Sequence, residues 1–215
     1  MEALKLKDSI SDKIDRYLNF LCEKGIIQDE KEKFHARFSE KSDYWKDRFN
    51  LFRSIYIKPI ENLLIADLGC GFGGFTICSA QKKGRLIFSD YQTKNVKITW
   101  LRLKELALSQ RGQGIVSDIR FLPFKDETFD LVSCLEVLEH VGEEKKWNKN
   151  YDYRQDVKSV VKELIRVTKR SGHIFVLVPN KAFPLEIHSK TLFGNYFPNF
   201  IHKKLWGNIA LSFTR

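Results

Sequence analysis

The stretch Asp67-Leu68-Gly69-Cys70-Gly71-Phe72-Gly73-Gly74 decides how this 215-residue chain folds. An apolar run at 63–66, typical of a buried strand, precedes it, and a segment of helical character at 75–81 follows it. Glycines let the backbone turn tightly and approach a ligand, and the first N–H groups of a helix can donate to that ligand. The spacing fits both D-x-G-x-G-x-G and the dinucleotide pattern G-x-G-x-x-G. The turn therefore predicts a ligand site without choosing the ligand.

Short apolar runs alternate with longer helical patterns after this turn. We expect further strands at 86–90, 114–118, 129–134 and 173–178, and helices at 93–109 and 157–167. Strands that are apolar along their whole length, separated by helices, indicate a parallel sheet covered on both faces. The predicted fold is α/β, a Rossmann-like three-layer sandwich with a mainly parallel sheet. In such a sheet the ligand lies at the carboxyl ends of the strands.

Two flanking segments differ in pattern from this central part, which spans 61–180. Residues 1–60 carry apolar residues at helical spacing and predict a helical N-terminal extension. This extension either packs against the central domain or forms a lid over an active site. Residues 181–215 are rich in aromatic residues and lysines, and either complete the domain or contribute to a binding site.

The net charge of +10 is spread along the chain. Residues 1–60 hold 13 Lys and Arg against 11 Asp and Glu, residues 61–180 hold 19 against 15, and residues 181–215 hold 5 against 1. A nucleic-acid footprint would cluster on one element, so a nucleic-acid partner is not favoured.

The four cysteines form no CxxC pair, which predicts neither a metal site nor a disulfide framework. With no apolar run of about 18 residues and no secretory signal, we expect a cytoplasmic protein.

Three carboxylates are predicted at the ends of successive strands. Asp67 follows the first strand, Asp90 ends the second and Asp118 ends the third. Asp90 can accept hydrogen bonds from ribose hydroxyls, and Asp118 can accept from an adenine amino group. A row of carboxylates suits a ligand that carries a sulfonium and an ammonium better than it suits a pyrophosphate. The charge pattern therefore favours S-adenosylmethionine (SAM) over NAD.

An ordered set of motifs resembles the class I SAM-dependent methyltransferases, and within them the type 11 methyltransferases. Residues 65–73 resemble motif I, and residues 117–132 (SDIRFLPFKDETFDLV) resemble the block D-x-x-x-L-P-F-x-D-x-x-F-D-x-V. Residues 134–141 (CLEVLEHV) are similar to the LEH end of the family's fourth strand. Residues 164–173 (LIRVTKRSGH) match R-V-L-K-P-G-G, with departures at Arg170 and Ser171. The resemblance covers about 61–180 and makes this segment a SAM-binding domain.

The resemblance assigns roles to individual residues. It implies that Asp67, Gly69, Gly71 and Gly73, with Cys70 inside the same turn, hold the methionine half of SAM. Asp90 would take the ribose, and Tyr91 would flank the adenine. Asp118 and Ile119 would bind the adenine amino group and ring edge, and Glu136 would line the pocket near the sulfonium. For Asp67 and Asp118 a purely structural role as strand-end caps is the alternative, and for Glu136 a structural role is equally open.

Methyl transfer is an in-line displacement that mainly requires alignment of acceptor, methyl and sulfur. A general base is needed only when the acceptor must lose a proton. His140, four residues after Glu136, and His188 are the catalytic candidates, with a structural role as the alternative for His140.

The acceptor is open at the level of the sequence. The favoured function is a methyltransferase that acts on a small molecule, a lipid or a glycan. The first alternative is an RNA or protein methyltransferase, although no Asn-Pro-Pro-Tyr motif follows the fourth strand. The second is an NAD-dependent oxidoreductase or a non-catalytic nucleotide-binding domain.

The C-terminal segment could cover the sheet, form an apolar acceptor pocket or contact a membrane surface peripherally. Only 208–213 could supply the family's final hairpin, which is therefore abbreviated or cut short.

Overall fold

A computed structural model of the chain describes residues 19–25, 44–142, 151–178, 185–186 and 191–192. The chain divides into a unit of residues 1–177 and a unit of residues 178–215. The elements of the first unit are α3 (Tyr44–Ile55), β1 (Leu64–Leu68), α4 (Gly74–Gln81), β2 (Arg85–Asp90), α5 (Thr93–Glu105), β3 (Gly112–Val116), β4 (Phe129–Leu135), α6 (Tyr153–Val167) and β5 (Thr168–Leu177), with 3₁₀ turns at Ser109–Arg111 and Leu138–His140. In the second unit, β6 (Leu185–Glu186) pairs antiparallel with β7 (Thr191–Leu192).

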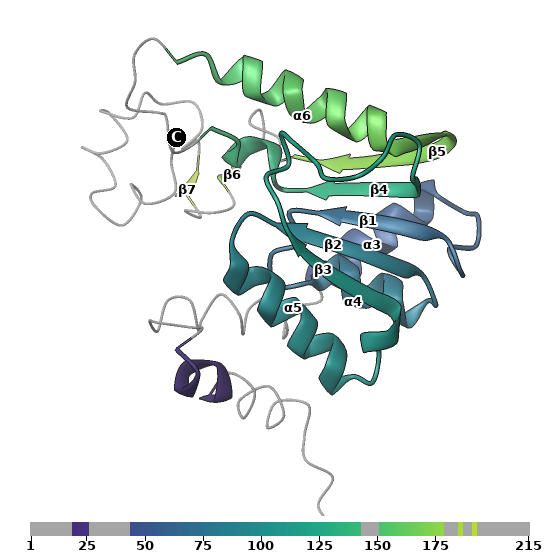
Figure 1. Ribbon diagram of the computed structural model, residues 1–215, viewed down its shortest axis with the longest axis vertical. Coiled ribbons are helices and arrows are strands. Elements are labelled where there is room, and N and C mark those ends of the chain that lie inside the picture. The colour runs from purple at the N-terminus through teal and green to yellow at the C-terminus, as the bar shows by residue number, and fades with distance from the viewer. Residues whose placement is uncertain (1–18, 26–43, 143–150, 179–184, 187–190, 193–215) are drawn as a thin grey trace, which may run out of the picture. The chain divides into compact units, whose positions relative to one another are not determined.

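The five strands of the first unit form one parallel sheet in the order β3-β2-β1-β4-β5 (Figure 1). The chain winds outward from β1 to β3, and then returns to the other side of β1 to add β4 and β5. The order therefore reverses between β1 and β4, and in open α/β sheets this is the place where ligands bind. The predicted Rossmann-like fold is confirmed.

Helices cover both faces of this sheet and make it a three-layer sandwich. On one face α3, α4 and α5 bury a cluster that includes Phe49, Phe75 and Phe88. On the other face α6 buries a second cluster, to which Val160 and Leu164 contribute. Each fully buried side chain of this size stabilises the fold by about 1.5–3 kcal/mol. Burial on both faces explains why β1 and β4 are apolar along nearly their whole length.

The helix α3 belongs to this packed unit. Phe52 is buried and its ring lies 5.4 Å from the ring of Phe75 in α4 and 5.2 Å from that of Phe175 in β5. For this part of the predicted N-terminal extension, the structure thus shows packing against the domain. The rest of that extension, apart from residues 19–25, lies outside the described residues, as does the segment 208–213 predicted for the final hairpin.

Several predicted boundaries were wrong: α6 begins at Tyr153 and not at 157, and β1 ends at Leu68 and not at 66. The third strand is Gly112–Val116, and not 114–118, so Asp118 lies two residues beyond it. Glycine is needed inside this strand because a Cβ on Gly112 would lie 2.7 Å from Leu103, and one on Gly114 would lie 2.6 Å from Val96. These side chains come from α5, which packs directly on the strand.

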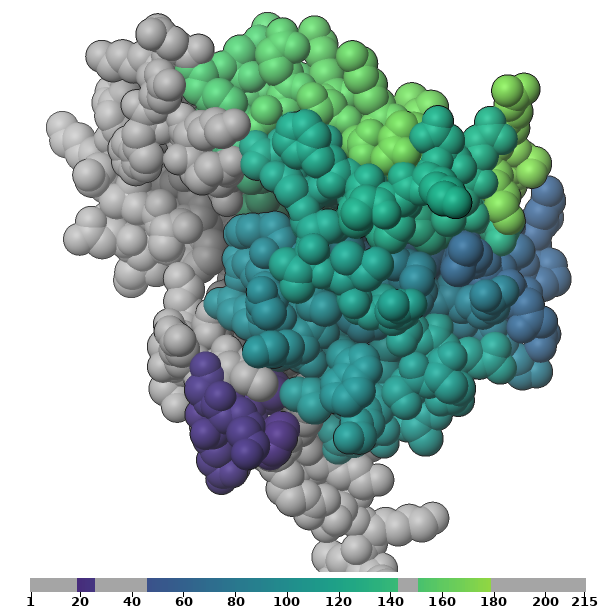
Figure 2. All heavy atoms as spheres, viewed as in Figure 1, coloured from purple at the N-terminus to yellow at the C-terminus, as the bar shows by residue number. Residues whose placement is uncertain are grey.

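Two further errors concern α5 and β5. The predicted helix 93–109 ends at Glu105, because Ala107 adopts a left-handed conformation with φ 56°. The strand predicted at 173–178 begins already at Thr168, directly after α6, and the register on β4 shifts between Phe129 and Leu131. The shift accommodates the longer stretch between Thr168 and His173 in β5, which lies opposite the two-residue step from Phe129 to Leu131 in β4. Figure 2 shows α6 and β5, in green, forming the outer surface along one side of the first unit.

Among the described residues, none of the helices has the length and apolar character that a membrane span requires.

Candidate cofactor site at the carboxyl ends of the strands

The glycine turn between β1 and α4 is held by backbone hydrogen bonds to the neighbouring strand β2. The N–H groups of Gly69 and Cys70 donate to the carbonyl of Ser89 at 2.8 and 2.9 Å. Two side chains of α5 also bond to the turn: the Thr99 hydroxyl donates to the Gly71 carbonyl at 3.0 Å, and Arg102 donates to the Phe72 carbonyl. The turn is therefore fixed by the protein itself before any ligand arrives.

The glycines of this turn have two different tasks. Gly69, Gly71 and Gly73 all have positive φ, at 76°, 50° and 79°. A Cβ on Gly69 would lie 2.3 Å from Val137, and one on Gly73 would lie 2.6 Å from Thr99, so both positions are closed by the chain's own side chains. A Cβ on Gly71 would meet none of the described residues within 4 Å. Within the described part of the chain, Gly71 is thus the glycine of this turn that a ligand can approach closely.

Asp90, at the end of β2, faces this turn. One carboxylate oxygen accepts from the Gly71 N–H at 3.0 Å, and the other accepts from the Gln92 N–H at 2.9 Å. A carboxylate offers about four lone-pair sites, so both oxygens keep capacity for further donors. The position next to Gly71 fits the predicted role in binding ribose hydroxyls.

Asp67 occupies a different environment from the one that the sequence suggested. Asp67 is only 3% exposed, and its carboxylate oxygens accept from the hydroxyls of Thr76 at 2.5 Å and Ser133 at 2.8 Å. Burial raises the pKa of this carboxyl, and the two hydroxyl donors oppose that change. Asp67 therefore braces β1 against α4 and β4 beneath the turn. Its described contacts match the alternative of a structural role.

Asp118 lies in the loop after β3 and is held by Arg120. The Arg120 guanidinium donates to both carboxylate oxygens, at 2.7 to 3.0 Å, and the Arg120 backbone N–H donates at 2.9 Å. Partial burial raises the pKa of Asp118, but these hydrogen bonds outweigh it and leave the pKa below its usual range. Of the three predicted carboxylates, Asp118 is thus paired with a neighbouring guanidinium, and Asp67 and Asp90 are both buried, at 3% and 5% exposure. All three stand at or just after the carboxyl ends of β1, β2 and β3, so the row of carboxylates lies along that edge of the sheet.

Glu136 follows β4, across the point where the strand order reverses. Its φ is 56°, an unfavourable left-handed conformation for a residue with a side chain, and its N–H donates to the Leu177 carbonyl of β5 at 2.8 Å. Its carboxylate accepts from Arg48 Nε at 3.3 Å and Nη2 at 3.2 Å. Strained backbone of this kind persists where the surroundings impose it and is frequent at functional sites.

Arg48 was missed at the level of the sequence. It lies in α3, between the aromatic residues that pack on the sheet, and 88 residues separate it from Glu136. No local spacing signals such a contact. The only sequence signal was that charges in this helix alternate with the aromatic residues.

The remaining predicted residues differ in how they are placed. Tyr91 follows Asp90 directly and is 72% exposed, and Ile119 packs against the α6-side cluster. The side chain of Cys70 is buried, which raises its pKa well above the usual value, so this residue faces the site through its backbone. His140 ends the 3₁₀ turn after Glu136 and is exposed. His188 lies outside the described residues.

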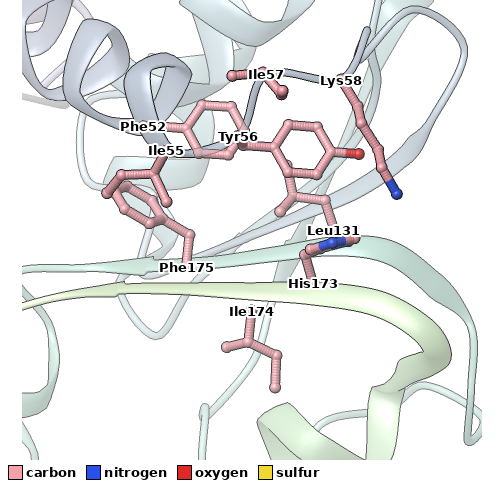
Figure 3. Close-up of a pocket in the computed structure, with 9 residues that line it drawn as sticks. All are labelled: Phe52, Ile55, Tyr56, Ile57, Lys58, Leu131, His173, Ile174 and Phe175. Carbon is pink, nitrogen blue, oxygen red and sulfur yellow. The ribbon is translucent and has the colours of Figure 1, made fainter.

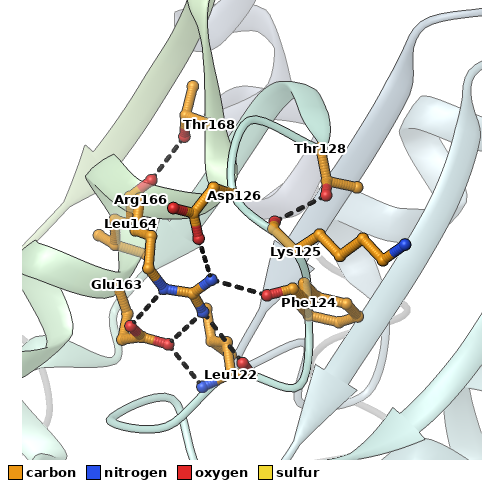
Figure 4. A network of polar contacts seen from close by, with 9 residues as sticks. All are labelled: Leu122, Phe124, Lys125, Asp126, Thr128, Glu163, Leu164, Arg166 and Thr168. Carbon is orange, nitrogen blue, oxygen red and sulfur yellow. Dashed lines mark hydrogen bonds and ion pairs between the residues drawn. The ribbon is translucent and has the colours of Figure 1, made fainter.

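A network around Arg166 holds the loop between β3 and β4 (Figure 4). Arg166, from α6, donates to the carbonyls of Leu122 and Phe124 at 3.0 and 2.7 Å and to Glu163 at 2.7 and 2.8 Å. Glu163 in turn accepts from the Leu122 N–H at 2.7 Å. The motif residues of 117–132 and 164–173 thus meet in space. This contact fixes the loop that carries Asp118.

An apolar pocket of about 180 Å³ lies elsewhere, between the end of α3 and β5 (Figure 3). The rings of Phe52, Tyr56 and His173 line it, and Ile174 points to the opposite face of the strand. His173 pairs with Leu131, in the first half of β4, whereas Glu136 follows the end of that strand. The pocket is smaller than ordinary small-molecule sites, which start at about 300 Å³, and it is separate from the glycine turn.

Comparison with known proteins places this geometry in a family. The family model described as a methyltransferase domain matches residues 66–176. The chain is 36% identical over 131 residues to an uncharacterised protein of Methanocaldococcus jannaschii, covering 60% of this chain and 47% of that protein. It is 28% identical over 167 residues to a ubiquinone biosynthesis O-methyltransferase of Paracidovorax citrulli, covering 71% and 65%. The chain thus spans about half to two thirds of the length of these relatives.

A solved structure agrees in fold. A SAM-dependent methyltransferase from Aquifex aeolicus superposes with a TM-score of 0.57 over 80% of this chain and 84% of that one, at 15% identity.

The chain belongs to the family of methyltransferase domains, since the matched segment spans more than half of it and runs from within β1 to within β5. The resemblance to class I SAM-dependent methyltransferases is confirmed, and with it SAM as the cofactor of the family. The alternative of an NAD-dependent oxidoreductase is set aside.

Proposed function

We propose that this protein transfers the methyl group of SAM to an acceptor of low molecular mass, a small molecule, lipid or glycan, bound at the carboxyl ends of the strands. The observation that carries the proposal is the turn at Gly71, where an open backbone position lies within hydrogen-bond distance of the Asp90 carboxylate. This combination lies inside the segment that matches the methyltransferase family.

The charges at the site suit the methionine half of SAM. That half of the cofactor carries an ammonium and a carboxylate as well as the sulfonium. Glu136 and Arg48 provide one charge of each sign, both about four-fifths buried, at the end of β4. An ion pair of this kind can exchange partners with a zwitterion at little electrostatic cost, and a guanidinium binds a carboxylate through two parallel hydrogen bonds. Arg48 is therefore proposed to hold the methionine carboxylate.

The ribose and the turn are the second part of the proposed site. Asp90 accepts from the ribose hydroxyls with the lone pairs that Gly71 and Gln92 leave open. The Gly71 backbone lets the ligand come into van der Waals contact with the turn. SAM, when bound, supplies a methyl carbon that its sulfonium already activates. The protein's task is then to hold the acceptor in line with that carbon and to exclude water.

The choice of a low-molecular-mass acceptor rests on two observations. The excess positive charge is not concentrated on one element, as a nucleic-acid site would require. One relative carries the name of a ubiquinone biosynthesis O-methyltransferase, and this name supports the proposal of a small-molecule acceptor. The aromatic and basic segment 181–215 is our candidate for contacts with such an acceptor or with the membrane surface that holds it.

Transfer of a radiolabelled methyl group from SAM into a fractionated cell extract tests this function. We expect label in the low-mass or organic-extractable fraction, with loss of transfer in Asp90→Ala. A Glu61→Ala variant is the matched control, because Glu61 pairs with Lys83 before β1, at the opposite ends of the strands. Label confined to RNA or protein would establish the alternative acceptor class. SAM binding without any transfer would establish a non-catalytic domain.

A further inference from the structure

A chain of polar contacts links the predicted adenine carboxylate to the helix α6. Asp118 is paired with Arg120, whose Nη1 also donates to Asp156 of α6 at 2.5 Å. Asp156 accepts in addition from the Tyr151 hydroxyl at 2.6 Å. One guanidinium therefore bridges two carboxylates that lie 38 positions apart, and a tyrosine orients the second one.

The charged side chains in this series of contacts differ in solvent exposure, and the most exposed one is the predicted ligand contact, Asp118. The side chains of Arg120 and Asp156 are 19% and 18% exposed, whereas that of Asp118 is 40% exposed. The bridge is thus mostly enclosed, and its more exposed end is the Asp118 carboxylate, near the start of the loop after β3. The Asp118 carboxylate is therefore the part of this bridge that a polar ligand group can reach.

We infer that Arg120 and Asp156 are positioning residues that set the selectivity for adenine, because they hold the Asp118 carboxylate aimed at the 6-amino group. The inference rests on the proposed function, since it requires that SAM occupies this site.

The physical reason lies in desolvation. An adenine base that covers Asp118 removes water from its carboxylate. Removing water from an unpaired carboxylate has a high cost in free energy. Arg120 stays bonded to both carboxylate oxygens of Asp118 while the ligand binds. Its positive charge therefore remains beside the carboxylate, and the carboxylate keeps one orientation. Asp156 and Tyr151 hold the guanidinium in the plane that this requires. Lysine could not replace it, because a single ammonium lacks the fork of donors that bonds two carboxylates together.

The test compares two ligands on the purified chain by calorimetry. One is S-adenosylhomocysteine, and the other is its analogue in which hydrogen replaces the 6-amino group. A hydrogen bond to a charged acceptor predicts about 10- to 100-fold tighter binding of the adenine ligand to the native chain. Arg120→Met is expected to reduce that ratio at least about fivefold, by weakening the adenine ligand alone. Asp156→Asn is expected to reduce it about threefold, and Arg120→Lys should not restore it.

The controls separate positioning from general damage to the fold. Arg170→Met makes the same chemical change at an arginine whose side chain is 91% exposed, and should leave both affinities unchanged. Tyr151→Phe and Asp156→Asn keep the side-chain volume and serve if Arg120→Met does not fold. Equal weakening of both ligands, or an unchanged ratio, would overturn the inference. Equal affinity of the native chain for the two ligands would overturn it as well. A native chain that binds neither ligand would overturn the proposed function, and this inference with it.

Discussion

At the scale of single residues, the glycine turn was predictable and its neighbours were not. Spacing alone indicates a turn that can face a ligand, because only glycine adopts the required φ without strain. Which glycine faces the ligand depends on Val137 and Thr99, which close two of the positions from distant parts of the chain. The enclosure of Asp67 and the Arg48–Glu136 pair depend in the same way on contacts between distant elements. Long-range packing of this kind leaves no local pattern in a sequence.

Alanine at Gly71 should mainly weaken ligand binding, whereas alanine at Gly69 should mainly lower stability. Gly71→Ala is expected to cost about 1–2 kcal/mol of stability, from its left-handed φ, and to weaken SAM binding at least about tenfold, since the methyl enters the ligand's space. Gly69→Ala adds a 2.3 Å contact with Val137 and should cost about 2–5 kcal/mol. Urea denaturation and calorimetry measure the two quantities. Equal loss of stability in both variants would contradict the division of tasks.

At the scale of elements, the order of strands and helices followed from the sequence, whereas their ends did not. Apolar runs predict buried strands because both faces of a parallel sheet are covered. The ends of α5 and β3 depend instead on a left-handed Ala107 and on the packing of α5 against Gly112 and Gly114. The motif resemblance was more informative than periodicity here, because it identified the segments 117–132 and 164–173, which Arg166 joins.

The clamp between Glu163 and Arg166 predicts a pH-dependent stability. Arg166 holds the pKa of Glu163 below its ordinary value of 4.5, and partial burial opposes this only in part. The stabilisation is therefore present above pH 4.5 and is lost as the pH falls through the lower pKa of the folded state. Glu163→Gln should lower the free energy of unfolding by about 1–3 kcal/mol at pH 7, and by less as the pH falls below about 4.

Urea denaturation at several pH values measures this difference. Glu127→Gln is the matched control, because Glu127 pairs with the exposed Arg170 at the surface and should contribute less than about 1 kcal/mol. A Glu163→Gln deficit that is the same at pH 7 and at pH 3.5 would show that the clamp is not electrostatic.

At the scale of the whole molecule, the fold and the family were predictable, and the acceptor was not. The sheet order and the glycine turn define the site proposed for SAM, and four ordered motifs are enough to recognise that arrangement. The acceptor depends on segments that vary around the common sheet. The central claim therefore concerns the cofactor site, and it can be tested before the acceptor is known.

Calorimetric titration of the purified chain with S-adenosylhomocysteine is the most direct test of that claim. We expect one ligand per chain for the native protein, an affinity at least about tenfold lower for Asp90→Ala, and no change for Glu61→Ala. Absence of binding heat with the native chain, at several temperatures, or equal affinity of the native and Asp90→Ala proteins, would contradict the account.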